Sequence, residues 1–229
     1  MNLKIRRPRL WLAAAVVTFL IGVTISIALR TKSSQTPQPS HNEVRLIIPK
    51  AGWEPIFFKT INSLTGLTAQ TELRKISMGE GEHEARIWWG FGLSPLEGIS
   101  LRYSGGRWSA IHVKADNYYE PTKATREELK PPRSGWETTW QRLVDAGILT
   151  LVDESEVNCR EPGLDGISVV VETNIDRTYK TYKYSNPMLE KCSQAKQVVK
   201  ITDTISEEFE WTRTETTPPP DKRLQQTRR

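Results

Sequence analysis

Three carboxylates and one imidazole are the side chains in this sequence whose types suit acid–base chemistry. Asp153, Asp165 and Glu172 lie around two predicted strands in the second half of the chain, and His112 lies in a predicted hairpin in the first half. Such groups transfer protons when they are held within hydrogen-bonding reach of a substrate. Each also has a structural interpretation, since Asp165-Gly166 is by itself a turn signal. We take the four as candidate catalytic residues of a hydrolase.

Compact catalytic motifs are absent from the sequence. It has no GxSxG nucleophile elbow, no HExxH, no P-loop and no GxGxxG that opens a helix. These absences exclude the easily recognised hydrolases and nucleotide-binding proteins, although a site assembled from scattered residues remains open. We therefore predict a non-catalytic binding domain without a cofactor, with an envelope hydrolase as the alternative.

The segment GEGEHE is the densest group of possible metal ligands. Glu80, Glu82, His83 and Glu84 offer oxygen and imidazole ligands to a divalent cation. On an extended backbone the three glutamates lie on one face and His83 lies on the other, so the four side chains do not converge. We predict a solvated acidic loop and no metal site.

Aromatic side chains provide the candidate binding surface. Trp88, Tyr179, Tyr182 and Tyr184 all fall in predicted strands. Exposed rings on a sheet stack against sugar rings or apolar side chains, whereas buried rings only fill a core. If these rings are exposed, the expected partner is an envelope protein or a glycan.

The two cysteines, Cys159 and Cys192, suit an exported domain. In an oxidising compartment an even pair of cysteines indicates a disulfide. The bond would close a loop of about 33 residues and stabilise the fold by about 4 kcal/mol on a chain-entropy estimate. The alternative is two separate thiols, with Cys192 buried on a helix face.

The stretch from 134 to 153 has the clearest start and stop signals for a helix. Ser134 with Glu137 predicts a capping box at its start, and Gly147 predicts a left-handed residue at its end. Residues 148–152 follow as an apolar run of strand length. Between the two ends an apolar stripe recurs at helical period, formed by Trp136, Trp140, Leu143 and Val144.

A tight hairpin is expected around Gly105-Gly106, because two glycines suit the left-handed turn that joins antiparallel strands. With Ser104 paired to Arg107, the strands should place Tyr103 opposite Trp108 and Ile99 opposite His112. His112 then lies on the apolar face of the hairpin.

Other strands are predicted at 44–49, 53–58, 86–91, 167–172 and 178–184. Alternation in the third of these puts Trp88 on the face opposite Ile87 and Trp89. A second helix is predicted from Asn186-Pro187 to Phe209, and one helical turn is expected where Thr125 is followed by Glu128. These elements predict an α+β fold, in which two main helices pack on an antiparallel sheet.

Charge is distributed unevenly along the chain. The formal net charge is +5 and the isoelectric point is 9.2. However, residues 1–32 carry six basic and no acidic side chains, and residues 212–229 carry five basic and two acidic ones. The remaining chain has 21 basic and 25 acidic side chains, so its surface is mildly acidic. A nucleic-acid-binding domain would carry positive charge on its folded surface, and we therefore expect no nucleic-acid partner.

The segment Leu10 to Leu29 is a run of twenty uncharged residues, and a helix of that length, about 30 Å, spans a bilayer. Four basic residues precede it and two follow, which favours a cytoplasmic N-terminus. Two interpretations stay open: a retained signal-anchor in the cell membrane, or a signal peptide cleaved after Ala28 that leaves a secreted or periplasmic protein. Both export the domain.

The expected organisation therefore has five parts. Residues 1–9 form a basic cytoplasmic N-terminus, 10–29 form a transmembrane helix in contact with the lipid bilayer, and 30–42 form a flexible tether. Residues 43–211 form the extracytoplasmic α+β domain, and 212–229 form a disordered basic tail.

Overall fold

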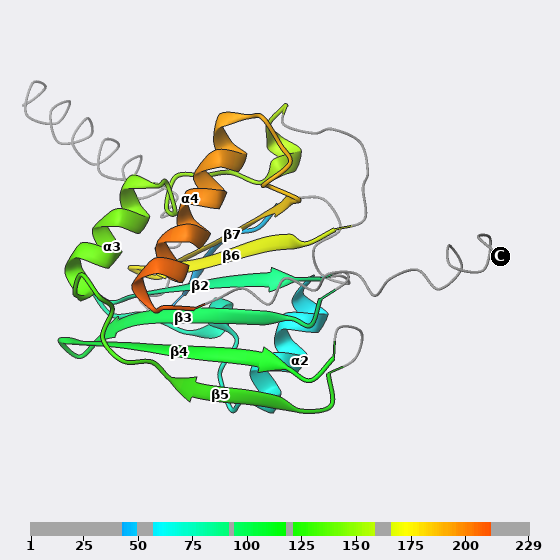
Figure 1. Ribbon diagram of the computed structural model, residues 1–229. Coiled ribbons are helices and arrows are strands. Elements are labelled where there is room, and N and C mark those ends of the chain that lie inside the picture. The colour runs from blue at the N-terminus through cyan, green and yellow to red at the C-terminus, as the bar shows by residue number, and fades with distance from the viewer. Residues whose placement is uncertain (1–42, 50–56, 92–93, 118–120, 159–165, 212–229) are drawn as a thin grey trace, which may run out of the picture. The chain divides into compact units, whose positions relative to one another are not determined.

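The structure, a computed structural model, describes residues 43–49, 57–91, 94–117, 121–158 and 166–211 (Figure 1). These residues form an α+β domain with a mixed seven-stranded sheet and three α-helices. The predicted membrane span at 10–29, the tether at 30–42 and the tail at 212–229 lie outside the described residues. Among the helices that are described, none has the length and apolar character needed to cross a bilayer.

The sheet has the strand order β1-β7-β6-β2-β3-β4-β5. Every neighbouring pair is antiparallel except β1 and β7, which are parallel. The prediction of a purely antiparallel sheet is therefore wrong at this edge, where a strand from the start of the domain pairs with one from its end. The strands are β1 (Arg45–Ile47), β2 (His83–Gly90), β3 (Glu97–Ser104), β4 (Arg107–Ala115), β5 (Ala124–Glu128), β6 (Ser168–Ile175) and β7 (Thr178–Ser185).

The β3–β4 hairpin has the predicted register. Tyr103 pairs with Trp108 and Ile99 pairs with His112. Both turn glycines have positive φ, +58° at Gly105 and +74° at Gly106, which is the conformation that a two-residue hairpin requires. Since the turn and the strand alternation agree, this part of the fold is determined locally by the sequence.

Helices α3 (Trp136–Asp145) and α4 (Ser193–Glu208) cover one face of the sheet (Figure 1). The predicted stripe of α3 packs there, with Leu143 fully buried and Trp136, Trp140 and Val144 packed around it. Alternation along the strands sends every second side chain to this face. The buried core includes Ala85, Ile87, Ile99, Leu101, Val169, Val171, Val198, Ile201 and Ile205.

Helix α2 (Lys59–Leu67) covers part of the opposite face. Ile61 and Leu64 are buried there beside Trp88 and Tyr179. The strand predicted at 53–58 is wrong where it is described, because Phe57 and Phe58 lead directly into α2. Residues 50–56 lie outside the described part of the chain.

Trp88 fits against the sheet because its neighbour on β3 has no side chain. Gly98 pairs with Trp88, and a Cβ added at Gly98 would lie only 2.2 Å from Cε3 of the indole. Trp88 is 2% exposed. Its indole is therefore held between the sheet and the apolar residues of the α2 face.

The start of α3 differs from the predicted capping box. Gly135 is the N-cap with φ +86°, and no side chain caps the helix. The Ser134 hydroxyl instead donates to Glu208 at 2.9 Å, and Glu137 accepts from Trp108 Nε1 at 3.1 Å. Because Ser134 and Glu137 form hydrogen bonds with these distant residues, neither side chain caps the helix. At the other end Gly147 has φ +95°, which confirms the left-handed helix end.

Helix α4 begins later than predicted. Asn186 has φ +45°, and its side chain accepts a hydrogen bond from the Ile167 amide at 3.0 Å, so it ends β7 rather than starting a helix. Cys192 is the N-cap, and its Sγ accepts from the Ala195 amide at 3.3 Å. Cys159 lies outside the described residues, and the disulfide stays a prediction.

Two short predictions are also wrong. Residues 148–152 form a turn and an irregular segment after α3, in which the amides of Thr150 and Leu151 both donate to the Gly147 carbonyl. Residues 124–128 form strand β5, because pairing with β4 overrides the local helix signal at Thr125 and Glu128.

Candidate functional site

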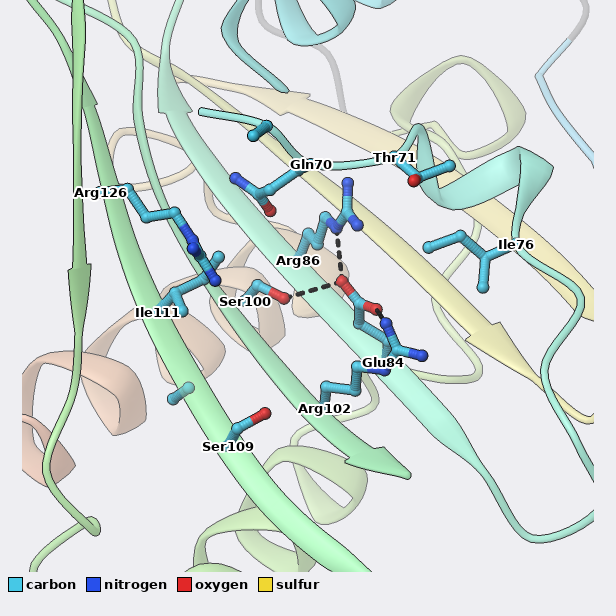
Figure 2. Close-up of a pocket in the computed structure, with 12 residues that line it drawn as sticks. Gln70, Thr71, Ile76, Glu84, Arg86, Ser100, Arg102, Ser109, Ile111 and Arg126 are labelled. Carbon is cyan, nitrogen blue, oxygen red and sulfur yellow. Dashed lines mark hydrogen bonds and ion pairs between the residues drawn. The ribbon is translucent and has the colours of Figure 1, made fainter. Parts of the chain in front are cut away.

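A polar pocket opens on the α2 face of the sheet, beside the part that α2 covers (Figure 2). It encloses about 310 Å³. Strands β2 to β5 supply its floor, and the segment that follows α2 supplies one wall. The lining residues are Ala69, Gln70, Thr71, Ile76, Glu84, Arg86, Ser100, Arg102, Ser109, Ala110, Ile111 and Arg126.

Strand register brings the charged residues of the pocket together. Arg86 pairs with Ser100 and Glu84 pairs with Arg102, so all four side chains share one face of β2 and β3. Arg126 of β5 pairs with Val113, a buried residue of the same face. Four strands from different parts of the sequence therefore meet at one patch.

A buried ion pair forms the base of the pocket. Arg86 Nε donates to Glu84 Oε1 at 2.7 Å, and the side chains of both residues are only 3% exposed. The Ser100 hydroxyl donates to the same oxygen at 2.9 Å (Figure 2). Arg102 Nη1 lies 3.6 Å from Glu84 Oε2, which is an ion pair but longer than a hydrogen bond.

Two polar atoms of this ion pair have no hydrogen-bond partner among the described residues. They are Nη1 of Arg86, a donor, and Oε2 of Glu84, an acceptor, and both are buried. Buried polar atoms in folded proteins nearly always have partners, and an exception needs a water, an ion or a ligand to explain it. At the base of the pocket, Arg86 Nη1 can therefore still donate to a bound group, and Glu84 Oε2 can still accept from one.

Glu172 of β6 lies next to the ion pair and is also buried, with 2% exposure. It accepts hydrogen bonds from Trp88 Nε1 and from the Tyr179 hydroxyl, each at 2.7 Å. Burial raises the pKa of Glu172, and the charge of Arg86 and these two hydrogen bonds oppose the rise without cancelling it. Glu172 is thus a structural carboxyl behind Arg86, with its oxygens already occupied.

Positive charge exceeds negative charge at the pocket. Arg86, Arg102 and Arg126 provide three guanidinium groups, whereas Glu84 is the only carboxylate in the lining. Arg126 is exposed and has no ion pair among the described residues. Arginine presents its donors in a planar fork that matches carboxylate and phosphate oxygens. The arrangement can bind an anionic group.

The predicted catalytic residues do not converge. Asp153 accepts from the Ser155 amide at 3.0 Å and from the Lys183 amide at 2.8 Å, so it caps a short turn and anchors it to β7. Glu172 lies on the α2 face, whereas His112 lies on the α3/α4 face. Asp165 lies outside the described residues.

His112 forms a separate structural cluster. Its Nε2 lies 2.7 Å from Glu97 Oε1, and Trp211 Nε1 donates to the same oxygen at 3.1 Å. Burial alone would raise the pKa of Glu97, but the hydrogen bond from His112 and the nearby charge of Lys114 lower it overall. Glu97 therefore has a full set of partners.

The predicted aromatic binding surface is not exposed. Trp88, Tyr179, Tyr182 and Tyr184 are at most 2% exposed. The hydroxyls of Tyr182 and Tyr184 donate to the carbonyls of Ile148 and Val152 at 3.0 and 2.9 Å. These rings fill the core on both faces of the sheet, so the core-packing interpretation holds and they form no exposed stacking patch.

The last two residues of the GEGEHE segment, His83 and Glu84, begin β2. Their side chains lie on opposite faces of the strand, as predicted for an extended backbone. His83 packs against Trp140, with ring centroids 4.4 Å apart, on the α3/α4 face, while Glu84 points into the pocket. Glu82 accepts from the Ser104 hydroxyl at 2.6 Å and from the Gly105 and Gly79 amides, and these bonds lower its pKa to about 2. It stabilises the β3–β4 turn.

A second pocket, of about 420 Å³, lies on the α3/α4 face. Its lining is mostly apolar and includes Trp89, Pro95, Ile167, Met188 and Leu189. Its charged lining residues, Glu97 and Lys114, lie 3.8 Å apart and pair with each other. We therefore place the candidate site at the polar pocket, where two buried charged atoms have no hydrogen-bond partner among the described residues.

The sequence analysis did not single out the three arginines of this pocket, and it interpreted Glu84 as part of a solvated acidic loop. A signal was present: Glu84 and Arg86 alternate with Ala85, Ile87 and Trp89 in one strand, which places charges on the face opposite the core. Their position around one pocket with Arg126 depends on strand order and could not be predicted. Comparison with protein-family models, curated proteins and solved structures gives no match, so these contacts carry the functional argument.

Proposed function

We propose that residues 43–211 form a non-catalytic binding domain of the cell envelope, and that the polar pocket takes up an anionic group of its ligand. The observation that carries this proposal is the buried guanidinium of Arg86, which has one nitrogen without a partner among the described residues and lines an open pocket. A buried cation without full hydrogen bonding costs stability. Such a cost is more readily understood at a binding site than in a core.

Binding fits the site better than hydrolysis. Acid–base catalysis needs two ionisable groups within reach of one substrate, and Asp153, Glu172 and His112 are each engaged at a different place in the domain. The hydrolase alternative therefore has no geometry in the described residues to support it.

The location in the envelope is part of the same proposal and comes from the sequence. Residues 10–29 would anchor the chain in the membrane with the N-terminus in the cytoplasm, and residues 30–42 would hold the domain near the outer surface of that bilayer. Cleavage after Ala28 would instead release the domain. Cell fractionation tests this: protein in the membrane fraction supports the anchor, and intact protein dissolved in the cytosol contradicts export.

The expected partner remains an envelope glycan or protein. The mildly acidic charge of residues 33–211 disfavours general attraction to polyanions, whereas the pocket concentrates three arginines in one place. Binding should therefore depend on the pocket rather than on the overall charge of the domain.

Calorimetric titration of the full-length protein with sodium acetate at constant ionic strength tests the proposal. Two variants, Arg102→Gln and Arg126→Gln, each remove one exposed guanidinium from the pocket. If each contributes about 1 kcal/mol to binding, each variant weakens binding about fivefold.

The matched control is Arg45→Gln. Arg45 lies on β1, at the opposite edge of the sheet, and is exposed, so this variant makes the same charge change away from the pocket. It should bind acetate as the wild-type protein does. Equal weakening in all three variants would show a nonspecific charge effect, and no saturable binding to the wild-type protein would overturn the proposal.

A further inference from the structure

The two unpartnered atoms at the base of the pocket differ in hydrogen-bonding sense. Arg86 Nη1 can only donate, and Glu84 Oε2, as a carboxylate oxygen, can only accept. Both belong to side chains that form one ion pair, so they lie in the same small region. A ligand that satisfies both must offer an acceptor and a donor close together.

From this pair of atoms we infer that the ligand is a hydroxy acid, in particular an acidic sugar unit such as a uronic acid. Its carboxylate would accept from Arg86 and Arg102, and a neighbouring hydroxyl would donate to Glu84 Oε2. The inference rests on the proposed function and specifies the chemistry of its ligand.

Access to Glu84 Oε2 depends on Arg102. Its side chain is 41% exposed, and its contact with Glu84 Oε2, at 3.6 Å, is longer than a hydrogen bond. A long, half-exposed side chain held by a weak contact changes rotamer at little cost. Rotation of Arg102 would uncover Glu84 Oε2 and leave the guanidinium free to pair with an incoming carboxylate.

The remaining walls of the pocket suit a polyhydroxylated ring. Gln70, Thr71 and Ser109 present amide and hydroxyl groups, each of which can donate and accept. The Ser100 hydroxyl donates its proton to Glu84 and can only accept from a ligand. The pocket volume of about 310 Å³ lies at the small end of the range for ligand sites, which favours a single sugar unit over a longer segment.

A phosphate group fits less well for an electrostatic reason. Phosphate oxygens that are deprotonated are acceptors, and one of them would face Glu84 Oε2, also an acceptor with negative charge. Like charges in a site shielded from water repel strongly. A carboxylate beside a hydroxyl avoids this repulsion because the hydroxyl turns its proton to Glu84.

The test compares three probes on the full-length protein: glucuronate, cyclohexanecarboxylate and glucose. The first has the ring, the carboxylate and the hydroxyls, the second lacks the hydroxyls, and the third lacks the carboxylate. We expect glucuronate to bind about tenfold or more tightly than cyclohexanecarboxylate, which corresponds to one strong hydrogen bond, and glucose to bind more weakly than either.

The variant Glu84→Gln tests the role of the acceptor. It keeps the shape and an oxygen for Arg86 Nε and Ser100, but it turns the acceptor Oε2 into an amide donor. Glucuronate should lose its advantage over cyclohexanecarboxylate. Thermal melting checks that the variant folds, and the probe series on the wild-type protein stands on its own if it does not.

The possible outcomes separate the two proposals. Equal affinity of wild-type protein for glucuronate and cyclohexanecarboxylate would overturn the hydroxy acid inference and leave anion binding in place. Absence of binding by both acids would overturn both, and would indicate that water satisfies the two atoms. An unchanged preference in Glu84→Gln would show that the hydroxyl is recognised elsewhere.

Discussion

The two faces of the sheet differ in the side chains that they bury and in the helices that cover them. The α3/α4 face is covered by two helices and buries mainly aliphatic and aromatic side chains. Glu97 is also buried on this face, but His112 and Trp211 are its hydrogen-bond partners. The α2 face is covered by one shorter helix, and beside its apolar core it buries Glu84, Arg86 and Glu172. Burying charge is costly unless every group is paired. In our proposal, the first face maintains the fold and the second binds the ligand.

The largest expected effect is at the ion pair of the α2 face. Arg86→Met removes the main partner of Glu84 and leaves a buried carboxylate without a hydrogen-bonding cation. Breaking a buried pair in this way typically costs 3–5 kcal/mol, so we expect a loss of about 4 kcal/mol in the free energy of unfolding by urea denaturation.

The double variant Glu84→Met/Arg86→Met is the control for this prediction. Replacing a buried ion pair by apolar side chains of similar size is often neutral for stability. The double variant should therefore recover most of the stability and still lose anion binding. If Arg86→Met alone leaves the free energy of unfolding unchanged, the ion pair does not stabilise the fold. That result would contradict the view that buried charge on the α2 face depends on pairing.

A truncation on the α3/α4 face should affect stability without affecting binding. Ile201 of α4 is fully buried in the apolar core, and Ile→Ala changes in cores cost about 2–5 kcal/mol. Chemical denaturation of Ile201→Ala should show a loss in the lower part of this range. Acetate binding by the folded variant should match that of the wild-type protein, and a weakened affinity would show that the faces are coupled.

A smaller loss is expected where the sheet makes room for Trp88. In Gly98→Ala the new Cβ would overlap the indole, whose Cε3 lies 2.2 Å from the Cβ position. Overpacking of this kind costs about 1–3 kcal/mol, measurable as a lower midpoint in thermal melting. Gly66→Ala is the control, because a Cβ there meets no atom within 4 Å, and it should melt at or above the wild-type temperature.

The smallest effect is a pH dependence at Glu172. Burial raises the pKa of this carboxyl above its ordinary value of 4.5, so the folded state favours the protonated form. Its contribution to stability is therefore complete below pH 4.5 and declines as the pH rises through the folded-state pKa. Glu172→Gln keeps the neutral form at every pH. The stability of the wild-type protein relative to this variant should fall from pH 4.5 toward neutral pH, and a rise would show that Glu172 is stabilised as an anion.

Sequence reasoning succeeded where the determining contacts are local. Gly105-Gly106 sets the hairpin register, and Gly147 ends α3, because each acts through its own backbone conformation. The prediction was wrong where a side chain bonds a residue far along the chain instead of its local partner. Ser134 forms no cap because Glu208, far along the chain, accepts its hydrogen bond.

The same reasoning explains why the candidate site was missed. Alternation showed that Trp88 faces away from Ile87, but the sequence could not show that α2 covers it, nor that Arg86, Arg102 and Arg126 meet on one face. The helix itself had a partial signal, since Phe57, Ile61 and Leu64 recur at helical period.

The most direct test of the central claim is a nuclear magnetic resonance titration of the arginine side chains with glucuronate. The Nε proton of Arg86 is buried and donates to Glu84, so it should exchange slowly and give an observable signal. We predict that this signal shifts saturably, with the same dissociation constant as a calorimetric titration with glucuronate. If it stays unchanged while signals of exposed arginines move, the ligand does not reach the pocket and the α2 face is not the binding face.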